Sequence, residues 1–467
     1  EIGVRLVGSE MCIRDRHRRA KMKLKSIGIV VTLVLTMFMA AIESSIISLA
    51  LPTIRKDLNA GTAVPLVFTV YFIALVVANP IVGELLTRFK ILYIAVVGIL
   101  LFGIGSFMSG MSETFTMLII SRVIQGLGAG VMMSLTQIVP KLAFEIPLRY
   151  KIMGIVGSVW GISSILGPLL GGGILEVATW HWLFYINIPI ALIAIVLAFL
   201  TFHFPEEAEV QHIHFDAKGL SLFYIFIGLL MFSLLNKTGV TFNIIAFILA
   251  IVILFVLFKY ENKKNMPFLP ISEFNKSISL VFITDLLIAI CLMGYNLYIP
   301  VYLQDYLKLS PIQSGLVIFP LSVAWLALNF NLAKVESKFS RKKLYIGAFI
   351  SLILSNMILV FGLHIPLIIA GAVILAGLSF GFVYTKDSVI VQEETSPKYM
   401  KKMMSFYALT KNLGSSIGST LMGSLYALQF GLLGGNFYNI LTVITIVALI
   451  LILMWVFLFK ENKESIK

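Results

Sequence analysis

Residues 157–172 read GSVWGISSILGPLLGG and lie in the middle of the fifth of a series of apolar segments. Glycines and serines leave one face of the predicted helix almost bare of side chains. In lipid, helices associate by close packing rather than by a hydrophobic force, so small residues let two backbones approach. Pro168 removes a backbone donor and bends a helix, which is tolerated where neighbours satisfy the freed carbonyl. We interpret the stretch as a hinge or seal; plain helix packing is the alternative.

The composition identifies the class of protein. Hydrophobic residues make up 59% of the 467, charged residues only 13%, and the mean hydropathy is +0.98. Soluble domains do not carry this balance, because an apolar run of bilayer length must face lipid or another such run. We therefore predict an all-α polytopic membrane protein. The two cysteines, Cys12 and Cys291, provide neither a disulfide framework nor a metal cluster, and we expect no metal and no cofactor.

Apolar runs of about 20 residues, broken at charges, proline and glycine, predict fourteen membrane-spanning helices. The predicted spans are 27–51, 64–86, 92–110, 116–139, 152–175, 183–203, 219–236, 242–259, 278–303, 311–333, 344–363, 366–386, 403–427 and 438–459. Residues 1–21 differ in character from the rest of the chain and lack an initiating Met, so we expect a non-native or upstream tail with Met22 as the start. The first apolar run carries no cleavage site, which predicts a retained span.

Positive charge is distributed unevenly between the two sides of the predicted membrane protein. An even number of spans puts both termini on one side. Placing them inside leaves 25 Lys and Arg residues inside from Lys21 onward, and only four outside: Arg55, Lys56, Lys237 and Lys308. By the positive-inside rule, this asymmetry predicts cytoplasmic termini. The net charge of +13 therefore reflects the cytoplasmic loops, and we expect no nucleic-acid partner.

A weak internal repeat predicts the domain organisation. Gly83-Glu-Leu-Leu-Thr-Arg-Phe-Lys follows the second span, and a similar basic loop that begins at Ala333 follows the tenth. Parallel duplication of six-helix halves is a transporter architecture. We predict an N-terminal six-helix bundle over 22–203, two inserted helices with flanking loops over 204–277, and a C-terminal six-helix bundle over 278–467.

Two charged residues deep in predicted spans are candidates for function, because charge is costly in hydrocarbon. Glu43 has no Lys or Arg within a turn of it, so we expect an isolated carboxyl that takes a proton or accepts a cationic substrate. A protonated carboxyl that only bonds neighbouring helices is the alternative. Arg122 stays charged and needs a carboxylate, a carbonyl or water opposite. Snorkelling to a surface is its alternative.

Other ionisable residues lie nearer the ends of their spans. For Asp285 in the ninth span and Lys411 in the thirteenth, function and snorkelling are equally open interpretations. Lys386 and Asp387 close the twelfth span, and we place both in the inner headgroup region. His181 lies between two tryptophans, which is typical of an aromatic belt at the outer interface.

Several motifs, in order along the chain, resemble the major facilitator superfamily. GPxxGG at 167–172 resembles the antiporter motif of that superfamily, and RxxQGxGxG at 122–130 resembles its span-four motif. Ala-Leu-Pro at 50–52 and Trp-His-Trp-Leu-Phe-Tyr-Ile-Asn-Ile-Pro at 180–189 are similar to its fourteen-helix drug:proton antiporter branch. The resemblance covers roughly residues 27–460 and implies two six-helix bundles around a central cavity, with substrate exported in exchange for entering protons.

From the resemblance and the residues together, we assign four sets of candidate site residues. Proton coupling is assigned to Glu43, Arg122 and Asp285. The antiporter motif comprises Gly157, Gly161, Gly167, Pro168, Gly171 and Gly172. The gating loop is represented by Gly83 and Arg88, and the expected substrate lining is Gln125, Trp160, Tyr295 and Asn296.

The gating loop departs from the pattern of the superfamily. Asp is usual where this chain has Thr87, and Gly is usual where it has Lys90; Ser337 replaces the corresponding Asp of the second half. In the family, that Asp locks the two halves through a network of charges. We therefore expect either a loosened inner gate or a lock that uses Glu84 or Glu336 instead.

The sequence thus predicts a monomeric, proton-coupled efflux antiporter that exports amphipathic drugs or toxic small molecules across the cytoplasmic membrane. A proton-coupled uptake symporter and an exporter of an endogenous metabolite are the alternatives, and the antiporter motif argues against the symporter. Short loops and buried charges argue against a membrane sensor or scaffold. The chain has no GxxxxGK[ST] sequence for an ATP-driven pump and no nucleophile or cofactor constellation for an enzyme.

Overall fold

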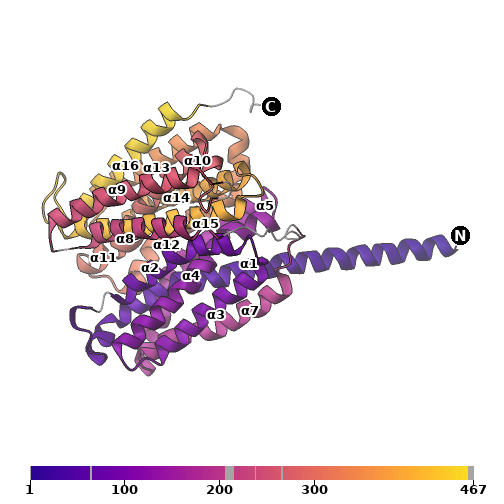
Figure 1. Ribbon diagram of the computed structural model, residues 1–467, viewed down its shortest axis with the longest axis horizontal. Helices are drawn as coiled ribbons and strands as arrows, with labels where there is room; N and C mark the ends of the chain where they lie inside the picture. The colour runs from indigo at the N-terminus through magenta and orange to yellow at the C-terminus, as the bar shows by residue number, and fades with distance from the viewer. Residues whose placement is uncertain (1, 64–65, 206–214, 237, 265–266, 461–467) are drawn as a thin grey trace.

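The computed structural model describes residues 2–63, 66–205, 215–236, 238–264 and 267–460. Within these ranges the chain is helical and contains no strand. The helices pack side by side into one bundle, and the first of them projects beyond it at its N-terminal end (Figure 1). The predicted all-α class is therefore confirmed.

Each of the fourteen predicted spans falls on one helix or on helices that follow one another directly. The N-terminal spans are α1 (Ile2–Asp57), α2 (Leu66–Leu85), α3 (Ile91–Gly110), α4 (Phe115–Ala143), α5 (Leu148–Val177), and α6 (His181–Tyr185) with α7 (Asn187–Thr201). The middle pair is α8 (Ala217–Leu235) and α9 (Val240–Asn262). The C-terminal spans are α10 (Lys276–Met293) with the π-helical turn η4 (Gly294–Tyr298) and α11 (Ile299–Asp305), then α12 (Pro311–Lys338), α13 (Arg341–Gly362), α14 (Pro366–Glu394), α15 (Met400–Ala427) and α16 (Phe437–Leu458).

Twelve helical stretches of the described chain are long and apolar enough to cross a membrane, judged by length and composition. The two predicted spans outside this set are α2, whose apolar part is the shorter helix Thr69–Leu85, and α15, which is rich in glycine, serine and threonine. These two helices pack against each other. Small and polar residues suit a helix that faces other helices rather than lipid. The chain is a multi-pass membrane protein.

The helices form two halves joined by two long contacts (Figure 1). Within the first half, α3 and α2 pack on α4, and α1 packs on α5 and α7; within the second, α13 packs on α14 and α16, and α10 on α15. The halves meet where α5 lies along α12 and where α2 lies along α15. Helices α8 and α9 pack against each other. Helix α8 also contacts α2, where the Tyr224 hydroxyl donates to the Val77 carbonyl at 2.6 Å.

The base of this pair is fixed by Asp216, which caps the N-terminus of α8 by accepting from the Gly219 N–H at 3.0 Å and pairs with Lys264. Burial alone would raise the pKa of the Asp216 carboxyl, but hydrogen bonds with Glu261, Lys264 and Gly219 bring that pKa below its ordinary value. Residues 206–214, in the predicted loop before this helix pair, lie outside the described chain.

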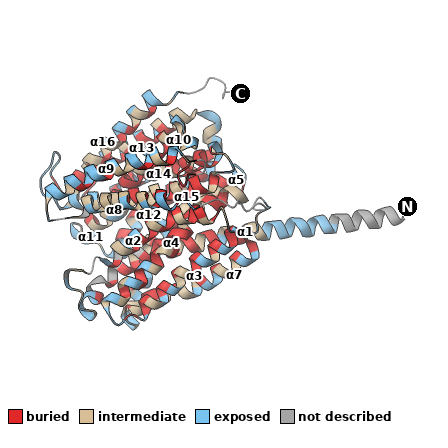
Figure 2. Cartoon of the chain, in the orientation of Figure 1, coloured by how far each residue is buried: buried red, intermediate tan, exposed pale blue. Residues whose placement is uncertain are grey.

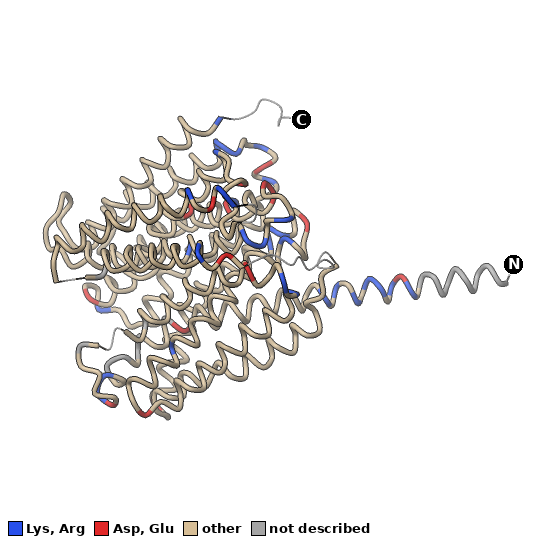
Figure 3. Tube along the Cα trace, viewed as in Figure 1, with Lys and Arg blue, Asp and Glu red and all other residues tan. Residues whose placement is uncertain are grey.

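Charge and burial agree with a bundle that spans a bilayer. Lys and Arg gather at the end from which α1 projects, which is the predicted inner side (Figure 3). Buried residues lie in the middle of the bundle, and exposed residues lie on the outer faces of its helices (Figure 2). Helix α9 leaves apolar side chains such as Phe242 and Phe255 more than half exposed. Such a surface is stable in lipid, where an apolar side chain has no cost of exposure.

The glycines of 157–172 bring α5 close to α12 of the C-terminal half and to α1 of its own half. A methyl group on Gly161 would lie 2.2 Å from Cβ of Ser322 on α12, and one on Gly157 would lie 2.7 Å from Nε1 of Trp325. On another face of α5, a methyl group on Gly167 would lie 2.2 Å from Oγ of Ser45 on α1. The expected close packing of this stretch is therefore confirmed, and it acts between the halves as well as within one.

The proline of the stretch frees a carbonyl at the contact between the halves. Pro168 lies inside α5 and has no N–H to donate to the carbonyl four residues earlier, which belongs to Ser164. Gly315 of α12 packs against that carbonyl so closely that a methyl group there would lie 2.5 Å from its oxygen. The approach of α12 is thus closest where the hydrogen bonding of α5 is interrupted.

We expect Gly161→Ala to separate α5 from α12 and to lower the thermal stability of the purified protein. The added methyl group overlaps Ser322, and overpacking of this kind costs about 1–3 kcal/mol. Gly172→Ala is the matched control from the same motif, because nothing lies within 4 Å of its added methyl group. Thermal unfolding in detergent measures both variants. Adding Ser322→Gly should restore the thermal stability of the Gly161→Ala variant. Equal melting temperatures of the Gly161→Ala and Gly172→Ala variants would contradict the packing account.

Candidate functional site

The centre of the N-terminal half contains a buried ion pair. Nη1 of Arg122 on α4 donates to Oε1 of Glu43 on α1 at 2.5 Å, and the two side chains are 0% and 2% exposed. Arg122 therefore does not snorkel, and its counter-charge is a carboxylate. The expectation of an isolated Glu43 carboxyl is wrong, because the helices bring together two residues that are 79 positions apart.

Neutral polar side chains hold both members of the pair in place. Asn187 of α7 donates to Oε2 of Glu43 at 2.9 Å, so both carboxylate oxygens have a donor. Arg122 donates from Nε to the Val67 carbonyl at 2.9 Å and from Nη1 to Gln125 at 2.8 Å. Gln125 in turn donates to Ser106 of α3 at 2.8 Å. The network thus links α1, α3, α4 and α7 and fixes the orientation of the carboxylate.

The network also holds polar atoms without a partner. The guanidinium carbon of Arg122 lies 4.3 Å from the centre of the Tyr71 ring, which is cation–π geometry. Nη2 of Arg122, Oδ1 of Asn187 and the Tyr71 hydroxyl are buried and accept or donate no hydrogen bond within the described chain. Leaving such buried polar atoms unpaired is costly, so they make this network a candidate site for a ligand or for water.

The C-terminal half buries charge as well. Lys411 lies 3.8 Å from Oδ1 of Asp285, and the Tyr407 hydroxyl donates to the same oxygen at 2.7 Å. Asp387 is also fully buried, where Oδ1 accepts from the Tyr345 hydroxyl at 2.5 Å. Asp387, predicted in the headgroup region, is buried inside the protein, and α14 continues for two further turns to Glu394.

At the inner end, an ion pair joins the halves. Nζ of Lys402 on α15 lies 3.0 Å from Oε1 of Glu84 on α2, and both side chains are buried. Gly83 makes this approach possible, since a methyl group there would lie 3.2 Å from Cβ of Ser405 on α15. Arg88, the other predicted gating residue, is half-buried in the turn after α2.

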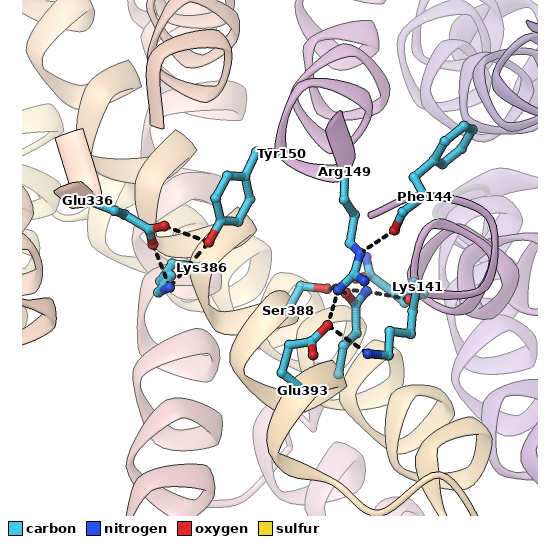
Figure 4. Close-up of polar contacts among 10 residues, drawn as sticks. Lys141, Phe144, Arg149, Tyr150, Glu336, Lys386, Ser388 and Glu393 are labelled. Atoms are coloured by element: carbon cyan, nitrogen blue, oxygen red, sulfur yellow. Dashed lines mark hydrogen bonds and ion pairs between the residues drawn. The ribbon is translucent and has the colours of Figure 1, made fainter. Parts of the chain in front are cut away.

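A second inner cluster joins α4 and α5 to the C-terminal half (Figure 4). Glu393 on α14 accepts from Arg149 on α5 and, at 2.7 Å, from Lys141 on α4. Beside it, the Tyr150 hydroxyl donates at 2.7 Å to Glu336 on α12, which pairs with Lys386 at 2.5 Å. Lys386 thus takes part in a contact of α14 with α12, beside Tyr150 of α5.

These contacts join the two halves at the end of the bundle where Lys and Arg gather, which is the predicted inner side. Asn412 extends the contact toward the middle of the bundle by donating to Asn79 of α2 at 3.1 Å. Two arrangements were expected, a loosened gate and a lock through Glu84 or Glu336, and in the structure both glutamates contact the opposite half.

The expected substrate-lining residues do not surround one space. Gln125 is buried within the N-terminal network, and Tyr295 is buried in the C-terminal half, where its hydroxyl bonds Ser355 at 3.0 Å and contacts Asn356. Neither is open to a ligand in this conformation, because intramolecular partners occupy its polar atoms. Asn296 is half-buried in η4, and Trp160 on α5 is 36% exposed.

Comparisons with known proteins bear on the chain as a whole. The model of the Major Facilitator Superfamily matches residues 33–419. The chain is 68% identical over 446 residues to the multidrug efflux pump SdrM of Staphylococcus aureus (strain N315), which covers 96% of this chain and 100% of that protein. It is 26% identical over 412 residues to the multidrug transporter protein MdtP of Bacillus subtilis (strain 168), covering 85% of this chain and 75% of that one. In fold it is similar to a crystal structure of a double-tryptophan mutant of XylE, with a TM-score of 0.66, 14% identity, and coverage of 94% and 96%.

We expect Lys402→Met to open the inner end, because it leaves Glu84 as a buried charge without a counter-charge. Breaking a buried pair in this way costs about 3–5 kcal/mol. A cysteine at Ser405, in a background without Cys12 and Cys291, reports the opening through alkylation by an impermeant maleimide in inside-out vesicles.

The reaction should be slow in the parent protein, because Ser405 is buried, and several-fold faster with Lys402→Met. Lys398→Met is the matched control, since Lys398 is exposed at the same end. An identical alkylation rate in all three proteins would contradict a lock at this pair.

Proposed function

The chain belongs to the major facilitator superfamily, and from this membership we propose that it exports amphipathic drugs from the cell in exchange for protons. The similarity to a multidrug efflux pump over the whole length of that relative supports the substrate class. The buried pair of Glu43 and Arg122 is the observation that carries the coupling mechanism. The proposed place of action is the cytoplasmic membrane, with both termini in the cytoplasm and a monomer surrounded by lipid as the working unit.

Glu43 is the group for which proton and substrate compete. An ionised carboxylate inside the bilayer needs a counter-charge, and Arg122 provides it when neither proton nor drug is bound. A proton makes Glu43 neutral and weakens its attraction for a cation, whereas a cationic drug replaces Arg122 as partner. Because one carboxylate cannot serve both at once, drug release and proton uptake alternate.

Alternating access requires the inner contacts to break and re-form. In the proposed mechanism, the pair of Glu84 with Lys402 and the cluster around Glu393 hold the inner side closed until substrate binds, and these ion pairs support that proposal. When the inner side opens, these ion pairs separate and water hydrates their charged groups. Helix α5 then moves against α12 along the stretch 157–172. Gly83, in the last turn of α2, and Arg88, in the turn that follows it, lie where the halves separate in this step. The membrane potential contributes roughly 2.3 kcal/mol per charge per 100 mV to the net charge moved.

Proton release on addition of substrate tests the proposal directly. Inside-out vesicles that contain the protein are loaded with a pH-sensitive dye and energised, and ethidium or tetracycline is added. We expect each substrate to raise the internal pH as protons leave in exchange. No response to any member of a panel of drugs, with folded protein present, would contradict drug export and favour the alternatives, an exporter of an endogenous metabolite or an uptake symporter.

We expect Glu43→Gln to abolish pH-driven export, because glutamine cannot exchange a proton. Arg122→Ala should reduce it at least about tenfold, since the carboxylate then lacks its counter-charge and holds its proton. Glu176→Gln is the matched control, because Glu176 is exposed at the outer end of α5. Dye export from the same vesicles, normalised to the amount of protein, measures all three. Unchanged export by Glu43→Gln would contradict the proposed coupling site.

A further inference from the structure

A cavity lies at the inner end of the C-terminal half, between the start of α10 and the end of α16 (Figure 1). Its volume is about 240 Å³, and it is lined by Asn275, Lys276, Ser277, Leu458, Phe459 and Lys460. These residues come from the start of the predicted span 278–303 and from the end of the predicted span 438–459. The cavity therefore lies where the helices leave the apolar part of the membrane, at the level of the lipid head groups.

Contacts between three helices fix the surroundings of the cavity. Nε1 of Trp455 donates to Oγ1 of Thr284 at 2.9 Å and joins α16 to α10. Lys342, at the start of α13, donates from Nζ to the carbonyl oxygens of Val456 and Phe459 at 2.9 and 3.3 Å. Carbonyl groups at the end of a helix carry a negative partial charge, which this ammonium group offsets. An anion in the cavity therefore does not face an uncompensated helix C-terminus.

The cavity carries an excess of positive charge. Lys276 and Lys460 line it and are exposed, and neither forms an ion pair with another residue of the described ranges. Arg341 borders the cavity, with Nη1 3.5 Å from Oγ of Ser277, but it is paired with Glu394 at 2.8 Å. Lys276 is also the first residue of α10, and the N-terminus of a helix carries a positive partial charge. Two lysines thus remain without a counter-charge from the described chain.

An apolar surface adjoins the charged cavity on the side of the membrane. Leu453 and Phe457 lie four positions apart on one face of α16, Leu458 lines the cavity, and all three are more than half exposed. One water occupies about 30 Å³ in the liquid, so the cavity admits a phosphate group together with a few waters. A ligand that fits both parts has an anionic group at head-group level and an apolar chain beside α16. Anionic phospholipids have this form.

We propose that this cavity binds the phosphate group of an anionic phospholipid of the inner leaflet, with Lys276 and Lys460 as its counter-charges. The phosphate oxygens accept hydrogen bonds from the two ammonium groups, and one acyl chain lies along Leu453 and Phe457. A zwitterionic lipid binds more weakly, because its own cationic group competes with the lysines for the phosphate. The bound lipid joins the start of α10 to the end of α16, and the site lies apart from Glu43.

Native mass spectrometry of the delipidated, full-length protein, titrated with dioleoylphosphatidylglycerol, measures the affinity of the first lipid bound. We expect the double variant Lys276→Gln, Lys460→Gln to bind it about 20-fold more weakly than the wild type, because each lysine near an anionic lipid contributes roughly a factor of five. The double variant Lys334→Gln, Lys338→Gln is the matched control, since it removes the same charge from exposed lysines of α12 in the same half. It should keep the wild-type affinity. Equal affinities of the two double variants would overturn the site.

Ser277→Leu tests the cavity without a change of charge, because the larger side chain takes up space that the head group needs. We expect weaker binding of phosphatidylglycerol by this variant, with gel filtration and thermal melting as in the wild type; wild-type affinity would overturn the cavity as the site.

Two further ligands identify what the site recognises. Dioleoylphosphatidylcholine should bind the wild type and the Lys276, Lys460 variant equally, and a 20-fold loss for this lipid too would overturn recognition of anionic charge. Glycerol 3-phosphate at millimolar concentration should not displace phosphatidylglycerol. Displacement would indicate a site for soluble phosphate compounds and overturn the lipid assignment. Lipid binding is measured without transport, so its result is independent of the proposed export function.

Discussion

An ionised side chain inside a membrane needs a counter-charge, and this constraint governs both halves of the protein. In the N-terminal half, Glu43 and Arg122 neutralise each other at 2.5 Å, and Asn187 completes the hydrogen bonds of the carboxylate. In the C-terminal half, Lys411 lies 3.8 Å from Asp285, whose carboxylate also accepts from the Tyr407 hydroxyl at 2.7 Å. A transporter can exploit this constraint. When a ligand binds one member of a buried ion pair, the other member must lose its charge or find a new counter-charge.

The contact between the halves is made by different kinds of residue in the middle of the bundle and at its inner end. In the middle, Gly161 and Gly315 let α5 and α12 approach without polar bonds, so the surfaces can slide or part at little cost in desolvation. At the inner end, the pair of Glu84 and Lys402 holds the halves by charge. Water can solvate these ions when the gate opens, so their separation is reversible. Small residues thus provide the seam and ion pairs provide the lock.

The sequence predicted the positions of the helices well, because spans of about 20 apolar residues are set by the thickness of the bilayer. It also singled out Glu43 and Arg122, since a charge in hydrocarbon stands out without any alignment. It did not pair them, because periodicity within a helix carries no information about which face of a distant helix lies opposite. The burial of Asp387 was missed for a related reason: the end of an apolar run does not show whether a charged side chain there packs inside the protein. Tyr295 was expected to line a cavity, yet its hydroxyl found partners within its own half, which only tertiary structure reveals.

The proposed mechanism depends on competition between a proton and a cationic substrate for the Glu43 carboxylate. Equilibrium binding of ethidium to the purified protein, followed by fluorescence as the pH is lowered, tests this competition most directly. One competing proton weakens binding about tenfold per pH unit once the carboxylate is protonated. We predict that wild-type affinity falls in this way and that Glu43→Gln removes one proton from the dependence. The same dependence on pH in the wild type and in Glu43→Gln would contradict the competition.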